Sequence, residues 1–244
     1  MIIGVPIEIK ENENRVSMTP YAVQTLINDG HEVLVQDSAG LKSGFSNDEY
    51  VKFGARIVGT LDEVYQQSDM IVKVKEPQEA ELSKIRESQI VFTYFHFAAS
   101  KKLTESIVNS KCIAIAYETV TDDRGGLPLL APMSEVAGRM ATQVGAFYLQ
   151  KDHGGKGILL GGVTGVQKGR CVIIGGGVVG TNAAKMAVGL GAEVTILDVN
   201  HSRLEYLDDI FQGRVRTLYS NVVNIEDAVA EADLLIGGVL IAGR

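Results

Sequence analysis

The feature that most constrains this chain is a glycine-rich turn between an apolar segment and a helical one. The run from Cys171 to Ile174 is typical of a buried strand. It leads into a Gly-x-Gly-x-x-Gly pattern made by Gly175, Gly177 and Gly180. An Ala-rich helical segment follows, and then a second apolar run ends at Asp198, 18 residues past the last glycine. This order of strand, glycine turn, helix, strand and acidic residue predicts a dinucleotide-binding βαβ unit.

Each residue of the pattern has a separate physical role. Gly175 permits a tight turn out of the strand, and Gly177 lets the backbone approach a pyrophosphate without a Cβ in the way. Gly180 lets the helix pack closely on the sheet, and Asp198 can accept hydrogen bonds from a ribose. A glycine turn that binds nothing is the alternative, because a chain with 27 glycines produces the pattern by chance. The agreement of the flanking segments favours the cofactor site.

Length and charge narrow the function further. A chain of 244 residues is long enough for two modest domains, and its net charge of −7 argues against nucleic acid and anionic membranes as partners. The N-terminus is typical of a strand rather than a signal peptide, and no segment approaches the length of a membrane span. The spacing of His and Cys offers no metal site, and Cys112 and Cys171 lie in apolar runs as buried thiols do. We therefore expect a cytoplasmic protein without a metal.

Short apolar runs alternate with amphipathic segments along the chain. Helix starts are marked by Thr19 before a proline, by Ser46 and Thr60 in capping boxes, and by Ser100. This alternation predicts an α/β fold of two doubly wound parallel-sheet (Rossmann-like) domains, the second incomplete. The expected strands are Ile2 to Ile7, Glu32 to Val35, Arg56 to Val58, Met70 to Val74, Ile90 to Tyr94, Cys112 to Ala116, Cys171 to Ile174, Glu193 to Leu197, Val215 to Leu218 and Asp233 to Ile236.

The domain boundaries follow from the helical and glycine-rich segments. We expect a substrate (catalytic) domain over 1–131, a connecting helix over 132–151 and an incomplete NAD-binding domain over 152–244. Residues 152–169 are glycine-rich and predict a hairpin or arm. The four strands after this arm make one βαβαβ half of a Rossmann sheet and the first strand of the other half, so two more strands would be expected beyond Arg244.

Three polar residues of the first domain follow the carboxyl ends of predicted strands, where open parallel sheets bind ligands. They are Arg15, Lys75 and His96. An Arg guanidinium, a Lys ammonium and a His imidazole that carries a proton together suit a small anionic substrate. In such a substrate, an atom next to the anionic group gains or loses a proton. Each also has a plainer interpretation: Arg15 pairing with Glu11 or Glu13, Lys75 as a solvated strand end, and His96 as a half-buried residue among aromatic rings.

The same ambiguity applies to three residues of the second half. Ser134 lies near the start of the long helix and on the sequence alone is more simply a cap than a cofactor contact. Arg203 and Ser220 follow the second and third strands of the nucleotide domain, within reach of an adenosine, but surface positions are equally common there.

The chain resembles alanine dehydrogenases along its whole length. The segments that carry the resemblance are Glu13 to Pro20, Val72 to Pro77, Thr93 to Ala98, Pro132 to Ala141, Gly157 to Val163, Gly175 to Gly180 and Ala232 to Ile241. The resemblance implies NAD-dependent oxidative deamination of L-alanine to pyruvate and ammonia, and the reverse reaction. It also implies a homo-oligomer, usually a hexamer.

The resemblance assigns roles by position. Arg15 and Lys75 would hold the carboxylate and oxo group of the substrate, and His96 would be the general acid/base. The residues that would line the NAD site, besides the three glycines, are Ser134, Val178, Val179, Asp198, Arg203, Ser220, Val239 and Leu240.

Two other functions stay open at this point. One is the nucleotide-binding subunit of a proton-translocating transhydrogenase, a class that shares the two-domain plan and the Arg-Val-x-x-Thr-Pro opening but lacks the substrate histidine, so His96 argues against it. The other is a vestigial NAD-binding protein without activity.

The family chain continues well past Arg244 and supplies a second catalytic residue there. We therefore expect the 244-residue chain alone to bind NAD weakly and to turn over substrate poorly or not at all, because the sheet edge for two more strands would be exposed. Pyruvate reduction by this chain, measured beside a chain of full family length, checks this expectation. Comparable rates would contradict it.

Overall fold

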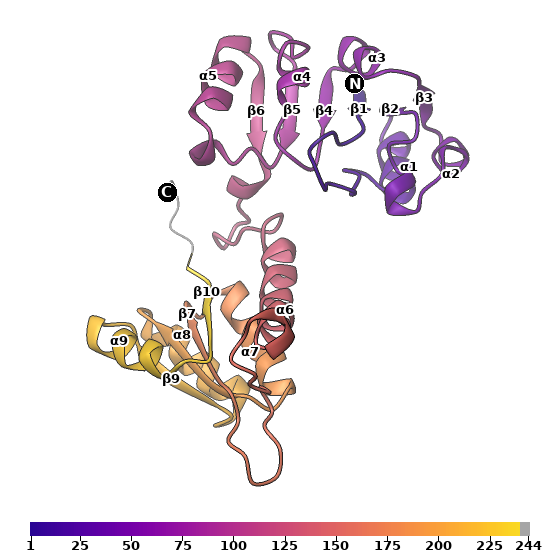
Figure 1. Cartoon of the computed structure of the whole chain (residues 1–244). Coiled ribbons are helices and arrows are strands. Elements are labelled where there is room, and N and C mark those ends of the chain that lie inside the picture. Colours follow the sequence, from indigo (N-terminus) through magenta and orange to yellow (C-terminus); the bar gives the residue numbers. More distant parts are fainter. Residues whose placement is uncertain (240–244) are drawn as a thin grey trace. The chain divides into compact units, whose positions relative to one another are not determined.

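The structure is a computed structural model that describes residues 1–239, and the chain divides into two compact units, Met1–Leu129 and Leu130–Arg244. The predicted cofactor residue Leu240 lies outside the described residues. Figure 1 labels the helices and strands of both units. None of the described helices combines the length and the apolar character that a membrane span needs.

The first unit is a six-stranded, fully parallel sheet with strand order β3-β2-β1-β4-β5-β6 (Figure 1). Its strands are β1 (Ile2–Val5), β2 (Glu32–Gln36), β3 (Arg56–Val58), β4 (Met70–Val72), β5 (Ile90–Thr93) and β6 (Ile113–Ala116). Its helices are α1 (Pro20–Asn28), α2 (Asn47–Lys52), α3 (Leu61–Gln67), α4 (Glu79–Leu82) and α5 (Lys101–Ser110), with 3-10 turns η1 (Leu41–Ser43), η2 (Phe97–Ala99) and η3 (Tyr117–Thr119). The order reverses between β1 and β4, which is the place where a doubly wound sheet opens a crevice for ligands.

The caps predicted from the sequence are present in this unit. Thr19 caps α1, and Ser100 caps α5. Ser46 and Thr60 form complete capping boxes at the starts of α2 and α3. Two separate apolar cores lie in this unit, one around Tyr65 and Phe95 and one around Tyr50. The helices therefore cover the sheet on both faces, as the nearly continuous apolar strands require.

The second unit is a four-stranded, fully parallel sheet with strand order β10-β7-β8-β9. Its elements are α6 (Ala131–Tyr148), η4 (Lys151–His153), β7 (Arg170–Ile174), α7 (Val178–Gly189), β8 (Glu193–Asp198), α8 (His201–Phe211), β9 (Val215–Tyr219), α9 (Val222–Glu231) and β10 (Leu234–Gly237). This arrangement is one βαβαβ half and the first strand of the other half, as predicted. The fold class is therefore confirmed for both units.

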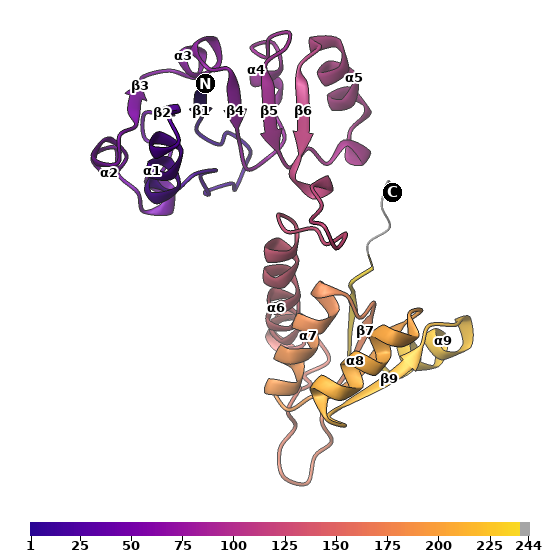
Figure 2. The same cartoon turned by 180° about the vertical axis from the view of Figure 1, so that it is seen from behind.

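The long helix α6 packs along α7, and the two lie side by side in Figures 1 and 2. Small residues make this close packing possible. A Cβ on Gly138 would lie 2.2 Å from the Val179 carbonyl oxygen, and one on Gly145 would lie 2.4 Å from the Leu234 side chain. Between α6 and β7, the glycine-rich segment contains an antiparallel bridge from Val163 to Val166, which gives it the turned-back path of an arm.

A fully buried ion network lies at the end of β4 in the first unit. The Lys73 ammonium is 3.2 Å from Glu8 and 2.8 Å from Glu81, and all three side chains are almost completely excluded from solvent. The Tyr65 hydroxyl donates to Glu81 at 3.1 Å. Burial raises the pKa of Glu8, and the nearby Lys73 charge opposes that rise. The network thus joins the loop after β1, the end of β4 and helix α4.

We expect Lys73→Met to destabilise the chain by about 3–5 kcal/mol, because it leaves two buried carboxylates without their shared cation. The matched control is Lys84→Met, which removes the more exposed ion pair with Asp62 and is expected to cost less than about 1 kcal/mol. Urea unfolding at neutral pH measures both. Equal losses in the two variants would show that the buried network contributes no more than a surface pair.

Candidate functional site

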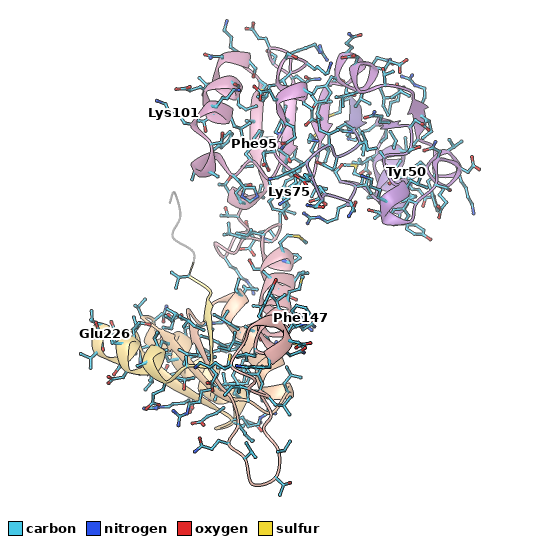
Figure 3. All side chains as sticks on the ribbon, in the orientation of Figure 1. Tyr50, Lys75, Phe95, Lys101, Phe147 and Glu226 are labelled. Atoms are coloured by element: carbon cyan, nitrogen blue, oxygen red, sulfur yellow. The ribbon has the colours of Figure 1, made fainter. Side chains whose placement is uncertain are left out.

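The carboxyl edge of the first sheet carries Arg15, Lys75 and His96, and Figure 3 labels Lys75 at this edge. Lys75 follows β4 and His96 follows β5, and the two loops are joined because the Thr93 hydroxyl donates to the Lys75 carbonyl at 2.8 Å. Arg15 and Tyr94 interact electrostatically, and the Tyr94 ring stacks on the His96 ring. The three residues that the sequence singled out are therefore gathered on one edge of one unit.

Arg15 forms a two-point ion pair with Glu13. Its Nε and Nη2 atoms donate to the two carboxylate oxygens at 2.8 and 2.6 Å, and its backbone N–H donates to the same carboxylate at 2.9 Å. These hydrogen bonds from Arg15 lower the pKa of Glu13 to about 2, and the charge of Lys75 contributes in the same direction. The Arg15 side chain remains half exposed. The pairing with the acidic loop, the plainer interpretation of Arg15, is thus present.

Lys75 is held through its backbone rather than through its side chain. The Glu8 carboxylate accepts from the backbone N–H of Val74 at 2.6 Å and of Lys75 at 3.4 Å. Within residues 1–239, the Lys75 ammonium makes no hydrogen bond or ion pair, and it is only partly buried. A cation in that state can bind the anionic or carbonyl oxygen of a small ligand.

His96 is exposed and does not lie in an aromatic core, as the plainer interpretation of its neighbours would require. Phe95 is completely buried and stacks on Phe97, so these two rings belong to the core side of the segment. The backbone of His96 has φ +51° and ψ +44°, and its ring lies nearly parallel to that of Tyr94 rather than with the two phenylalanines. Its imidazole is therefore accessible to a ligand at the sheet edge.

In the second unit the glycine turn lies between β7 and α7, and its geometry explains each glycine. Gly175 has φ +99°, a conformation that side chains strongly disfavour. A Cβ on Gly180 would lie 1.8 Å from the Gly175 carbonyl oxygen, so no larger residue fits without movement. A Cβ on Gly177 would meet nothing within 4 Å, which leaves the backbone open for close approach at the N-cap of α7. The free N–H groups of the first turn of a helix suit a phosphate at this point.

Asp198 and Arg203 both bind the peptide of Gly176. Asp198 accepts from the Gly176 N–H at 2.6 Å, and the Arg203 Nε donates to the Gly176 carbonyl at 2.5 Å. Arg203 also donates to the Thr181 hydroxyl at 2.7 Å and lies over the Tyr206 ring. The two residues therefore surround the glycine turn.

The other predicted cofactor residues are distributed around the same turn. Val178 and Val179 open α7, and the exposed Val239 side chain lies within 3.0 Å of the position that a Cβ on Gly175 would take. The Ser220 backbone N–H donates to the Asp198 carbonyl at 3.0 Å. These contacts gather the predicted residues at the carboxyl edge of the sheet.

The interpretation of Ser134 as a helix cap is wrong. Helix α6 begins at Ala131, its N-cap is Leu130 without a side-chain hydrogen bond, and Ser134 lies inside the first turn. It is one turn before Gly138, where a Cβ would lie 2.2 Å from the Val179 carbonyl oxygen. Since residues four apart share a helix face, Ser134 is on the side of α6 that packs toward the start of α7.

Three carboxylates that are not among the predicted site residues contact them: Glu8, Glu13 and Glu118. Each accepts a hydrogen bond from the backbone N–H of a predicted site residue, Lys75, Arg15 and His96 respectively. Only Glu13 is near its partner in the sequence, where its spacing from Arg15 predicts an ion pair. The other two pairs join distant segments, so no local spacing could have indicated them. In residues 1–239, no group of three or more His, Cys, Asp or Glu side chains is arranged to hold a metal ion.

Comparison with known proteins matches both parts of the chain. Residues 4–137 match the model of the alanine dehydrogenase/PNT N-terminal domain, and residues 141–244 match that of the C-terminal domain. The alanine dehydrogenase of Staphylococcus epidermidis is 58% identical over 243 residues, covering 100% of this chain and 65% of the relative. The chain thus spans about 65% of the length of the curated relatives it matches.

Solved structures agree with this match. An L-alanine dehydrogenase structure superposes with a TM-score of 0.91 at 52% identity, covering 100% of this chain and 67% of that one. A transhydrogenase from Sinorhizobium meliloti superposes with a TM-score of 0.81 at 23% identity, covering 100% of this chain and 71% of that one. At that identity the second likeness shows a shared fold alone.

The lowered pKa of Glu13 predicts an acid-dependent loss of stability. A carboxyl whose folded pKa lies below its unfolded value stabilises the fold above the unfolded pKa, and this stabilisation is lost as the pH falls through the folded pKa. For Glu13 the window runs from 4.5 down to about 2. We expect Glu13→Gln to flatten the fall in unfolding free energy over this window, and Glu11→Gln, a neighbouring exposed carboxyl, to flatten it less. Urea unfolding at several pH values measures the slopes, and equal slopes in wild type and Glu13→Gln would contradict the assignment.

Proposed function

This chain belongs to the alanine dehydrogenase/PNT family, and we propose that it performs NAD-dependent oxidative deamination of L-alanine to pyruvate and ammonia, and the reverse reductive amination. The observation that carries the proposal is the grouping of Arg15, Lys75 and His96 at the carboxyl edge of the first sheet. The partners would be the small molecules L-alanine, pyruvate and ammonium. Two cationic side chains and one proton carrier are sufficient to bind ligands of this size and to exchange a proton with them.

The residues of the first unit would divide the work as follows. The Arg15 guanidinium, already oriented by Glu13, would bind the substrate carboxylate, and the Lys75 ammonium would bind the oxo group of pyruvate. His96 would act as general acid/base, moving a proton as ammonia adds to the carbonyl carbon and as water leaves. Since His96 is exposed at the edge, its ring nitrogen can reach a bound ligand without rearrangement of the core.

The geometry of the second unit fits a dinucleotide. The open space over Gly177 would admit a pyrophosphate at the start of α7, and Asp198 would accept from the adenine ribose. Bound NAD supplies the hydride acceptor of the reaction. The residues proposed to hold it are Ser134, Gly175, Gly177, Val178, Val179, Gly180, Asp198, Arg203, Ser220, Val239 and Leu240.

We also propose that the protein is cytoplasmic and forms a homo-oligomer, which the resemblance to the family implies is a hexamer. The outer face of α6 supports an oligomer, because Val136, Met140, Val144 and Tyr148 are exposed at helical spacing (Figure 3 labels their neighbour Phe147). The free thiols of Cys112 and Cys171 are consistent with a reducing compartment.

The direct test is consumption of NADH in the presence of pyruvate and ammonium. Activity that requires both additions would support the proposal. No activity in any preparation that contains this chain would favour a vestigial binding protein instead.

Cofactor choice gives one prediction. We expect NAD(H) to bind at least about tenfold more tightly than NADP(H), about 1.4 kcal/mol, because the Asp198 carboxylate accepts from a ribose hydroxyl and repels a 2′-phosphate. Direct titration of both cofactors measures the ratio. Asp198→Asn is expected to reduce it, with the exposed Asp208→Asn as control. Equal affinities in wild type would refute the role of Asp198.

The sheet edge that carries Arg15 and His96 gives another prediction. In an active preparation we expect His96→Ala to lower kcat by roughly 10²–10⁴-fold, the usual effect of losing a general acid/base. We expect Arg15→Ala chiefly to raise the KM for pyruvate, because it removes a contact present in ground and transition states alike. His31→Ala, beside the amino end of β2, is the control and is expected to change neither constant. An unchanged kcat in His96→Ala would exclude it as the proton carrier.

A further inference from the structure

Glu118 binds two consecutive backbone N–H groups of the segment that carries His96. It lies in η3 after β6, and its carboxylate oxygens accept from the N–H of His96 at 2.7 Å and of Phe95 at 3.3 Å. These residues are 22 and 23 positions away in the sequence. One carboxylate therefore binds two successive peptide groups, Tyr94–Phe95 and Phe95–His96.

The backbone that Glu118 holds is in an unfavourable conformation. His96 has φ +51° in the left-handed region, and its next residues turn at once into η2. Residues other than glycine are uncommon there, and when they occur they are often found at functional sites. A charged hydrogen-bond acceptor at this N–H is the kind of contact that can maintain such a conformation.

The 3-10 turn η3, which carries Glu118, also contributes to the packing around the side chain of His96. Its ring is nearly parallel to that of Tyr94, with an interplanar angle of 19°. Tyr117, the neighbour of Glu118, packs edge-on against Tyr94 with ring centroids 4.8 Å apart. The Tyr94 hydroxyl donates to the Leu129 carbonyl. Glu118 thus binds the backbone of His96, and Tyr117 packs against the ring that lies beside the His96 ring.

We propose that Glu118 is a positioning residue that keeps His96 in the left-handed conformation and so directs its imidazole to the sheet edge. This role rests on the proposed function of His96 as proton carrier. The alternative is a general loop contact whose loss would affect folding alone. Other carboxylates of this unit make such contacts, for example Glu63, which accepts from the backbone N–H of Thr60 at the start of α3.

The first experiment compares Glu118→Gln and Glu118→Ala with wild type in pyruvate reductive amination, all in a chain of full family length. Glutamine keeps one acceptor oxygen, but the second oxygen is replaced by an NH2 group, which donates and cannot accept from the other N–H. We expect the alanine variant to lose about 10–100-fold in kcat, since small displacements of a catalytic group have effects of that size, and the glutamine variant to lose less. The KM for pyruvate is expected to change little, because Arg15 and Lys75 are held by other carboxylates. Glu63→Gln is the control and is expected to retain both constants.

The second experiment separates positioning from folding by a double-mutant cycle. If Glu118 acts through His96, then Glu118→Ala in a His96→Ala background is expected to cause almost no further loss of kcat. The amide proton of His96 is expected to move upfield in Glu118→Gln, which reports loss of the charged hydrogen bond independently of activity.

The outcomes are distinguishable. An active wild type in which the two losses multiply, or in which Glu118→Ala retains wild-type kcat, would overturn the role of Glu118 and leave the proposed function intact. A wild type of full family length without pyruvate-dependent NADH consumption would overturn the proposed function, and the positioning role with it. A non-additive cycle together with the amide shift would support the proposal.

Discussion

The buried contact between Glu8, Lys73 and Glu81 is the constraint on which the sheet edge with Arg15, Lys75 and His96 depends. Charges removed from water are tolerated only when they are paired and hydrogen-bonded, so these three side chains must remain together in the folded chain. Glu8 uses its remaining hydrogen-bonding capacity on the N–H groups of Val74 and Lys75. The requirement to satisfy a buried carboxylate therefore fixes the point at which Lys75 leaves the sheet, although Lys75 itself is not buried.

The same chemistry recurs at the other two residues of the edge. The loops that follow parallel strands have no ladder partners, so their N–H groups need other acceptors. Glu13 and Glu118 supply them at Arg15 and His96. An acceptor on the backbone leaves the end of the side chain accessible, which is the arrangement a binding site needs. Of these three residues, only Arg15 also has its side chain bound by the carboxylate. There the carboxylate keeps the guanidinium charged and orients it.

How much of this could be predicted from the sequence depends on how local the cause is. Apolar alternation, capping boxes and the glycine turn act over a few residues, so the strands, the caps and the fold class followed from the pattern. The contact between Glu8 and Val74 spans 66 residues and that between Glu118 and His96 spans 22, and glutamate at either position has no spacing signal. Ser134 was misinterpreted for a related reason. Its place was decided by the packing of α6 on α7 at Gly138, and that packing is a tertiary property.

The two predicted sites also differ in what they demand of the sequence. In the second unit the constraint at the glycine turn is steric, since a Cβ at Gly180 would meet the Gly175 carbonyl oxygen at 1.8 Å. Only glycine satisfies such contacts, so the requirement is visible as a motif. At the sheet edge with Arg15, Lys75 and His96 the constraint is the supply of acceptors for loop N–H groups, and a carboxylate from any well-placed segment can meet it. Site residues held in this way are therefore recognisable in the sequence only by their own chemistry, while the carboxylates that place them become evident from the fold.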